Sequence, residues 1–286
     1  MVRIITDSAS DLDIEVADNM GVTVVPMQIS FGEEVYKDRY EISVEDFYKK
    51  LIETDEVPKT SQVNPFAFEE VFDEVEKNGD SAVVITMSSK LSGTYQSAIM
   101  ASDGDYDNVY VVDSLNAAIG EQCLILYAVR LRDKGYNAKE IAKELERVKD
   151  KVQLIALLDT LEYLKKGGRI SSTAAFAGNL LSIKPVITVE DGLVKILGKA
   201  RGSKNGNNML KEFVRTCGGV DFDMPLLLGY TGLEKTMLDK YVQDSKELWE
   251  EGTSNFTVVR IGSTIGTHVG PGAIAVGFFP KGCLKE

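Results

Sequence analysis

Short apolar runs alternate with segments of helical period through the first half of the chain, and this order restricts the fold more than any other feature. The runs at residues 2–6, 22–26, 81–86 and 110–112 are rich in β-branched residues, which predicts buried strands. Hairpin signals between them are few, apart from one around Gly32. Because strands joined through helices pair in the same direction, the pattern predicts a parallel sheet covered by helices.

Helix-end signals mark the segments between these strands. Asparagine caps a helix and proline costs nothing at its first position, so Asn64 and Pro65 predict a helix start. Apolar residues at positions 68, 71, 72 and 75 then place one face of this helix on a core. Capping-box patterns at residues 43–46 and 137–140 predict two more helices, and others are expected over about 93–100 and 117–133.

Hairpins and helices are mixed in the second half of the chain. Apolar runs at residues 185–189 and 193–197 flank Asp191 and Gly192, and Asp-Gly is a strong hairpin signal. Four other strands are expected at residues 154–158, 224–230, 256–261 and 273–279. Three helices are expected at residues 161–166, 174–181 and 234–250. This mixture predicts a mixed, partly antiparallel sheet.

The change of pattern predicts two domains. A length of 286 residues is enough for one large domain or two modest ones. We place the boundary after the charged run at residues 139–151, which gives an N-terminal parallel α/β domain of residues 1–151 and a C-terminal mixed α/β domain of residues 152–286. No linker-like composition marks this boundary, so we expect the two domains to pack closely.

Net charge and residue counts exclude several classes of function. The formal net charge is −12, and an acidic surface opposes binding to phosphate backbones, so nucleic acid is not an expected partner. Cys123, Cys217 and Cys283 lie far apart, which disfavours disulfide frameworks and cysteine-rich zinc sites. The start of the chain lacks a signal-peptide pattern, and no apolar run reaches the roughly 18 residues of a membrane span. We therefore expect a soluble, cytoplasmic protein without membrane insertion.

Several catalytic motifs are missing from the sequence. There is no G-x-S-x-G and no Walker phosphate loop, and the single histidine, His268, excludes metal motifs that need two. Asp7 and Asp11 have the spacing of possible metal ligands, although capping of the next helix is the simpler interpretation. One histidine could still serve a hydrolase that uses Ser92 or Ser89, so that class stays open.

Hydroxyl-bearing residues gather where predicted strands end. Polar stretches at residues 6–8, 86–89 and 113–114 follow three strands of the parallel sheet, and ligand sites in such folds lie at the carboxyl ends of strands. Ser92 and Gly93 stand just before a predicted helix, whose first N–H groups would point toward a ligand above them. A carboxylate or a phosphate would suit this position.

Seven segments in chain order resemble the DegV family: ITDSASDL, TSQVNP, SSKLSGTYQSA, VVDSLNAA, DTLEYLKKGGRIS, LLSIKPVITVEDG and IGTHVGPGAIAVGF. The resemblance covers essentially the whole chain, and seven ordered motifs are much more specific than any one of them. It implies two α/β domains, an N-terminal Rossmann-like domain with a parallel sheet and a C-terminal domain with a mixed or antiparallel sheet. It also implies a ligand, a fatty acid, bound between the domains.

For function, the resemblance implies a lipid-binding protein that is not itself an enzyme and uses no cofactor. A long-chain fatty acid (C14–C18, such as palmitate, stearate or oleate) would lie in a buried tunnel, with its carboxylate held by serine and threonine hydroxyls. The family resemblance further implies the carrier subunit of a bacterial fatty-acid kinase. Such a carrier presents the bound acid to a separate ATP-binding subunit, which makes acyl phosphate.

The resemblance also implies the residues of the site. In the TSQ and SGTY motifs, the residues expected to hold the carboxylate are Thr60, Ser61, Ser92 and the adjacent Gly93. The residues expected around the head group or on a partner-facing surface are Arg169, Arg201, Thr267 and His268. His268 falls in a glycine-rich segment at residues 261–272, where we expect a turn. The family usually continues with further basic residues after the position of Arg201, whereas here only Lys204 follows closely.

Three alternatives to a kinase carrier stay open at the level of sequence. The chain could be a phosphotransfer component that carries a phosphoryl group on His268, or a hydrolase that uses a serine with His268. It could also be a standalone lipid sensor or buffer without a kinase partner.

Overall fold

A parallel sheet occupies the N-terminal half of the chain in the computed structural model, which describes residues 1–54, 56–104, 106–170, 183–250, 252 and 257–284. Its strands lie in the order β2 (Val22–Val25), β1 (Val2–Asp7), β6 (Ser81–Thr86) and β7 (Val109–Asp113), and every neighbouring pair is parallel. The central strands β1 and β6 are mostly buried on both faces, which explains their continuous apolar sequences. The predicted parallel sheet is confirmed.

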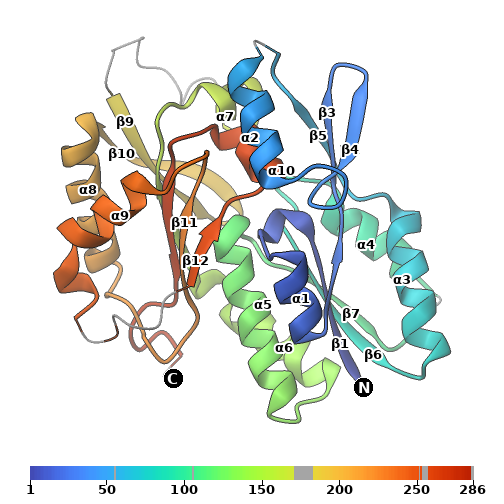
Figure 1. The fold of residues 1–286 in the computed structure, drawn as a ribbon. Helices are drawn as coiled ribbons and strands as arrows, with labels where there is room; N and C mark the ends of the chain where they lie inside the picture. The colour runs from blue at the N-terminus through green and yellow to red at the C-terminus, as the bar shows by residue number, and fades with distance from the viewer. Residues whose placement is uncertain (55, 105, 171–182, 251, 253–256, 285–286) are drawn as a thin grey trace.

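Helices cover both faces of this sheet (Figure 1). One face carries α5 (Ala118–Asp133) and α6 (Ala138–Val148), and the other carries α3 (Pro65–Lys77) and α4 (Thr94–Ser102). The shorter α1 (Ile14–Met20) packs beside β2. The start of α3 agrees with the sequence signal, because the Asn64 side chain accepts a hydrogen bond from the Phe66 N–H and Pro65 is the first helical residue.

A six-stranded mixed sheet forms the C-terminal half. Its strands lie in the order β10 (Leu193–Arg201), β9 (Ile183–Glu190), β8 (Gln153–Leu157), β13 (Ile274–Phe278), β11 (Leu226–Tyr230) and β12 (Thr257–Arg260). Neighbouring strands are antiparallel except β11 and β12, which are parallel. On the outer face lie α8 (Gly202–Thr216) and α9 (Thr236–Asp244) (Figure 1). The predicted mixed sheet is therefore confirmed.

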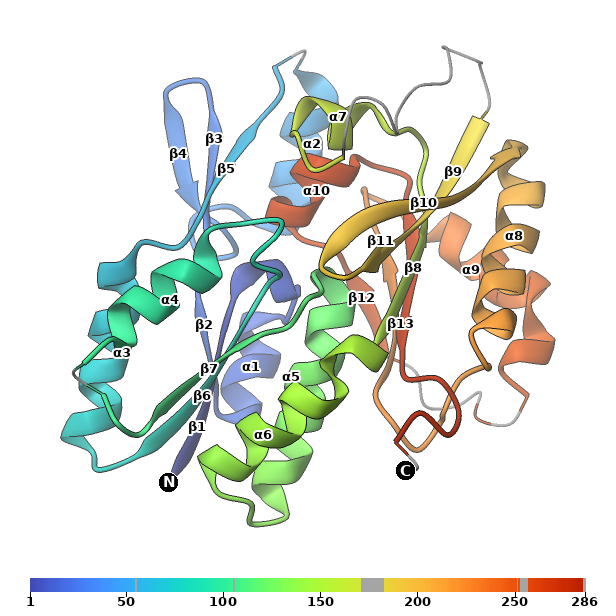
Figure 2. The ribbon, with the colours of Figure 1, turned by 180° about the vertical axis from the view of Figure 1, so that it is seen from behind.

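The β9–β10 hairpin reaches from the C-terminal sheet toward the N-terminal half (Figure 2). Asp191 and Gly192 form its turn with φ angles of 53° and 77°, as a tight two-residue turn requires. The Ser88 hydroxyl, in the loop after β6, donates a hydrogen bond to the Gly192 carbonyl at 2.8 Å. The hairpin thus closes one side of the space between the halves.

A small antiparallel sheet and three short helices gather at one end of the molecule, at the top of Figure 1. The small sheet contains β4 (Glu34–Lys37), β3 (Gln28–Phe31) and β5 (Lys59–Ser61). The helices are α2 (Val44–Glu53), α7 (Glu162–Lys166) and α10 (Ser263–Val269). Since α10 packs against α2, β3 and β5, residues from both halves of the sequence meet here.

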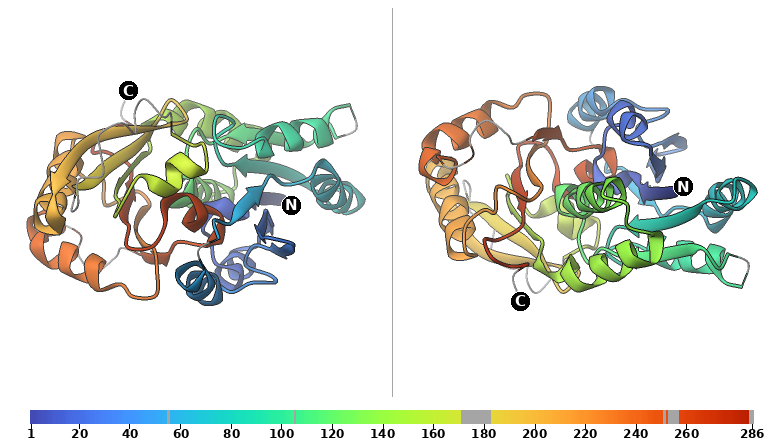
Figure 3. Two further views of the ribbon diagram at one scale, coloured as in Figure 1. Left: turned by 90° about the horizontal axis from the view of Figure 1, so that it is seen from above. Right: turned by 90° about the horizontal axis from the view of Figure 1, so that it is seen from below.

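The halves lie side by side with α5 between them, as the views from above and below show (Figure 3). This helix contacts β1 and β6 of the parallel sheet and β8, β11 and β13 of the mixed sheet. The domain boundary after residue 151 stays a prediction. Within the part of the chain that the structure describes, no helix has both the length and the apolar character needed to cross a bilayer.

Local signals did not predict every element. The turn expected over residues 261–272 is wrong, because Ser263–Val269 form α10, whose first turn is fixed by buried side chains from distant segments. The sequence also gave no signal for α8, whose GSKNGNN start has poor helix propensity. The long helix expected at 234–250 ends at Asp244 and is followed by a 3₁₀ turn, Lys246–Leu248. The helix expected at 174–181 lies outside the described residues.

Candidate functional site

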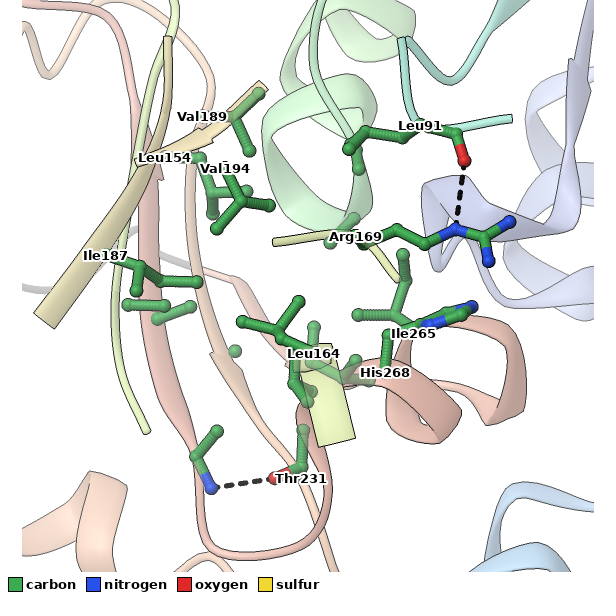
Figure 4. Close-up of a pocket in the computed structure, with 18 of the residues that line it drawn as sticks. Leu91, Leu154, Leu164, Arg169, Ile187, Val189, Val194, Thr231, Ile265 and His268 are labelled. Carbon is green, nitrogen blue, oxygen red and sulfur yellow. Dashed lines mark hydrogen bonds between the residues drawn. The ribbon is translucent and has the colours of Figure 1, made fainter. Parts of the chain in front are cut away.

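A largely apolar pocket lies between the two sheets (Figure 4). About 860 Å³ of space there is free of protein atoms, counting the part at its mouth that is open to solvent. The N-terminal half contributes the apolar side chains Met27, Met87, Leu91, Ala117 and Ala118. The C-terminal half contributes the larger share of apolar lining, including Leu154, Ala156, Ile187, Val189, Val194, Ala275 and Ile265. Both halves are therefore needed to enclose the pocket.

One side of the pocket, here called the polar end, carries Arg169 and His268 (Figure 4). Thr60 is joined to His268 there, and Ser92 follows Leu91, whose carbonyl oxygen accepts from Arg169. The opposite, apolar end is formed by Leu154, Ile187, Val189 and Val194, which Figure 4 shows away from Arg169 and His268. A molecule that fills the pocket would thus be mostly apolar, with a polar group beside Arg169 and His268.

The Thr60 hydroxyl and the His268 imidazole are joined at the polar end. Thr60 Oγ1 lies 2.9 Å from His268 Nε2, across 208 positions of sequence. Thr60 is on the edge strand β5 and His268 is near the end of α10, so the packing of α10 on the small sheet brings them together. The other ring nitrogen, Nδ1, is buried and has no hydrogen-bond partner among the described residues.

Burial keeps the His268 imidazole neutral. Loss of hydration, helped by the nearby positive charge of Arg169, lowers the pKa of His268 from its ordinary 6.5 to about 4. The backbone of Gly167 permits this close packing, because a Cβ atom at that position would lie 2.2 Å from His268 Nδ1. At neutral pH the ring can donate one hydrogen bond and accept one, but carries no charge.

Arg169 links the two halves at the polar end. Its Nε donates to the Leu91 carbonyl at 3.1 Å, and its Nη1 donates to the Gly167 carbonyl at the end of α7. The first of these bonds is drawn in Figure 4. The side chain is partly exposed and also lines the pocket, so a positive charge is available at the polar end.

Ser92 lies in the loop that leads into α4. Its Oγ is 2.9 Å from Thr94 Oγ1 and accepts a weaker hydrogen bond from the Thr94 N–H at 3.3 Å. Thr94 Oγ1 in turn accepts from the Val63 N–H at 3.3 Å. These bonds fix the Ser92 hydroxyl on the side of the pocket where Thr60 and Arg169 also lie.

The structure brings four of the eight residues expected in the site into the pocket wall, namely Thr60, Ser92, Arg169 and His268. The other four do not line it. Ser61 is exposed on β5, and Gly93 is the N-cap residue of α4. Thr267 is buried and donates its hydroxyl to the Ser263 carbonyl at 2.9 Å. Arg201 is exposed at the start of α8.

Three threonines in the pocket wall were missed at the level of sequence: Thr188, Thr231 and Thr264. Thr264 stands four residues before His268 on α10, so the two share one face of that helix. Assigning residues 263–269 to a helix would have paired them. Thr188 and Thr231 carry no local signal that separates them from other threonines on strands.

The geometry favours neither a serine hydrolase that uses His268 nor a metal site at Asp7 and Asp11. His268 Nε2 contacts Thr60, and neither Ser92 nor Ser89 is hydrogen-bonded to the imidazole among the described residues. Asp7 caps the 3₁₀ turn Ser8–Ser10 by accepting from the Ala9 N–H at 2.9 Å. In the described part of the chain, no three histidine, cysteine or acidic side chains are grouped so that they could hold a metal ion.

The chain is similar to known proteins over nearly its whole length. The family described as "Uncharacterised protein, DegV family" matches residues 1–281. A DegV domain-containing protein of Caldanaerobacter subterraneus subsp. tengcongensis is 34% identical over 282 residues, which cover 98% of this chain and 99% of that protein.

Solved structures of similar fold cover nearly the full length. A DegV family protein from Thermus thermophilus, described by its fatty acid binding, superposes with a TM-score of 0.86 at 30% identity, covering 98% of this chain and 99% of that one. A stearic acid-binding protein from Eubacterium ventriosum gives a TM-score of 0.85 at 27% identity with the same coverage. DegV, a fatty acid binding protein from Bacillus subtilis, gives 0.82 at 28% identity, again with the same coverage.

Proposed function

This chain belongs to the DegV family, and from that premise we propose that it binds a long-chain fatty acid in the pocket between its two halves. The observation that carries the proposal is the mostly apolar lining of the pocket, with Arg169 and His268 together on one side of it (Figure 4). A fatty acid has the same division. The fatty-acid binding described for the proteins from Thermus thermophilus and Bacillus subtilis supports this assignment.

The acyl chain supplies most of the binding free energy. A sixteen-carbon acid has about fourteen methylenes, and burying each is worth about 0.8 kcal/mol, or about 11 kcal/mol in all. Immobilising the flexible tail and the ligand as a whole offsets several kcal/mol of this. The remainder corresponds to submicromolar affinity without a strong ion pair.

The polar end orients the carboxylate. Carboxylate oxygens only accept hydrogen bonds, so the Thr60 hydroxyl must donate to the ligand and therefore accept from His268 Nε2–H. The Ser92 hydroxyl is the second donor, and Arg169 provides a positive charge nearby. The neutral state of His268 fits this role, because the ring is required only to donate one hydrogen bond.

We further propose that the protein is a carrier and not an enzyme by itself. A carboxylate held by hydroxyls at the pocket mouth keeps an oxygen free to attack the γ-phosphorus of ATP on a separate kinase subunit. The new oxygen–phosphorus bond forms as the bond to ADP breaks, which leaves acyl phosphate and ADP. In this proposal the exposed Arg201 is a partner-facing group. Ser61 and Thr267 are only the sequence neighbours of Thr60 and His268, and Gly93 is the N-cap residue that follows Ser92.

We also propose a cytoplasmic site of action. Cys123, Cys217 and Cys283 are all free, as is usual for proteins that work in a reducing compartment.

Native mass spectrometry of protein purified without added lipid tests the proposal directly. We expect a mass increment that matches a C14–C18 fatty acid, and identification of that acid after denaturation. A ligand-free mass, together with no uptake of added palmitate or oleate, would refute fatty-acid binding. An ATP-dependent assay with a candidate kinase subunit then separates a kinase carrier from a standalone lipid buffer.

A further inference from the structure

The helix that carries His268 is held at its first turn by two buried aspartates from distant segments. Asp11 Oδ1 accepts a hydrogen bond from the Gly262 N–H at 2.6 Å. Asp38 Oδ2 accepts one from the Thr264 hydroxyl at 2.6 Å and a longer one from the Thr264 N–H at 3.4 Å. Both carboxylates are almost completely buried. The start of α10 is therefore fixed from two directions.

A buried arginine completes this cluster. Arg39 Nη2 lies 3.1 Å from Asp11 Oδ1, and the arginine side chain is 5% exposed. The guanidinium packs on the backbone of Gly262, where a Cβ atom would lie 2.7 Å from Arg39 Nη2. The contact of Asp11 with Arg39, and a glycine where the guanidinium packs, thus hold three segments together, from residues 11, 38–39 and 262–264.

The backbone of this cluster is strained. Asp11 and Arg39 have φ angles of 60° and 66°, in the left-handed region that residues with a side chain rarely adopt. Such conformations cost free energy and persist only where the surrounding structure imposes them, commonly beside functional sites. Both members of the ion pair therefore have backbone conformations that the surrounding structure must hold in place.

We infer that Asp38, with Asp11 and Arg39, is a positioning residue that holds α10 so that His268 stays against Thr60. The path is short. Thr264 lines the pocket, donates its hydroxyl to Asp38, and stands four residues before His268 on the same face of a seven-residue helix. A helix this short has little stability of its own, so its position depends on its anchors.

The aspartates are not ligand contacts in this inference. Asp11 and Asp38 do not line the pocket, and a carboxylate would repel the carboxylate of a fatty acid. Their effect on the ligand passes through α10. That effect on affinity rests on the proposed function, whereas the effect on His268 itself does not.

The single histidine of the chain makes the test direct, because the imidazole gives one resonance in the NMR spectrum. We compare Asp38→Ala and Asp38→Asn with the control Asp80→Ala. Asp80 is a buried carboxylate at the start of β6 that pairs with Arg3 and the N-terminus, and it contacts nothing in α10. All three variants replace a buried carboxyl group, but only Asp38→Ala removes the acceptor for Thr264.

We expect Asp38→Ala to shift the His268 resonance of the ligand-free protein and to weaken palmitate binding about tenfold. Asp38→Asn keeps an acceptor oxygen and should restore most of both properties. Asp80→Ala should lower the melting temperature but leave the resonance and the affinity unchanged. An unchanged His268 resonance in Asp38→Ala, with the same loss of melting temperature as Asp80→Ala, would overturn the inference.

Two further results are decisive. If Asp38→Ala does not fold, Thr264→Val removes the same hydrogen bond from the helix side, and the His268 resonance must shift in that variant. If the wild-type protein does not take up palmitate, the proposed function fails. The His268 resonances of the ligand-free variants still decide whether Asp38 positions α10.

Discussion

Thr60 and Ser92 are the two hydroxyls that we assign to the carboxylate, and their removal is the most local test. Thr60→Val preserves shape and Ser92→Ala removes little else, so each should weaken palmitate binding roughly ten- to a hundredfold, which corresponds to about 1.5–3 kcal/mol for one hydrogen bond to a charged group. Isothermal titration would measure both affinities.

A neighbouring residue provides the matched control. Ser61→Ala changes an exposed hydroxyl on the same strand that does not line the pocket, so its affinity should equal that of the wild type. Equal losses for Ser61→Ala and Thr60→Val would contradict the assigned site.

His268 should make stability depend on pH in a defined direction. The pKa of the folded imidazole is lowered to about 4, while the unfolded value is near 6.5. Between these values only the unfolded chain binds the proton, so acidification favours unfolding and this contribution to stability is lost as pH falls. The full effect is about 3 kcal/mol.

Comparison with His268→Gln isolates this contribution. Burial raises the pKa of Asp7 to about 6 and of Asp11 to about 7, and these groups act in the opposite direction, losing stability as pH rises. They are present in both proteins and cancel. The wild-type free energy of unfolding in urea, minus that of His268→Gln, should rise from pH 4 to pH 6.5. A difference that is independent of pH would show that the imidazole is not held neutral.

Among the elements, the neighbouring strands β8 and β13 limit the space in the pocket, and so would limit the acyl chain in the proposed complex. Ala156 and Ala275 are paired across these strands, and both line the pocket. Ala156→Leu would fill space that methylenes of the ligand otherwise occupy. We expect palmitate to bind at least tenfold more weakly while decanoate loses little, as measured by competition. Equal weakening of both acids would indicate damage to the fold instead.

Local signals predicted elements well where neighbours in sequence supply the stabilising contacts. The start of α3 follows from Asn64 and Pro65, and the capping box of α6 forms between Asn137 and Glu140. The helix α10 was missed because its stabilising contacts come from Asp11 and Asp38, more than 200 positions away. No local pattern carries that information.

The candidate site could be predicted from the sequence only in part. Family resemblance pointed to Thr60, Ser92, Arg169 and His268, which the fold collects in one pocket. It gave no basis for separating them from Ser61 or Thr267, because a side chain's direction depends on the strand or helix that carries it. Placing Thr264 beside His268 would have required knowing that residues 263–269 form the helix α10.

At the scale of the whole molecule, a ligand enclosed by both halves should stabilise the entire fold. Palmitate at 100 times its dissociation constant should add about 2.7 kcal/mol and raise the melting temperature by about 5 °C. Calorimetry with increasing palmitate would follow this rise. Methyl palmitate, which keeps the tail but lacks the charge, should raise it less. No dose dependence with either compound would contradict binding between the halves.

The packing of α5 against both sheets affects how a ligand could enter and leave the pocket. Because this helix contacts both sheets, separating the halves would expose its apolar sides to water. The hydrophobic effect therefore opposes a hinge motion that separates the two halves. In the proposed function the ligand should therefore exchange while the two halves stay together, and we expect a partner to meet its carboxyl group beside Arg169 and His268.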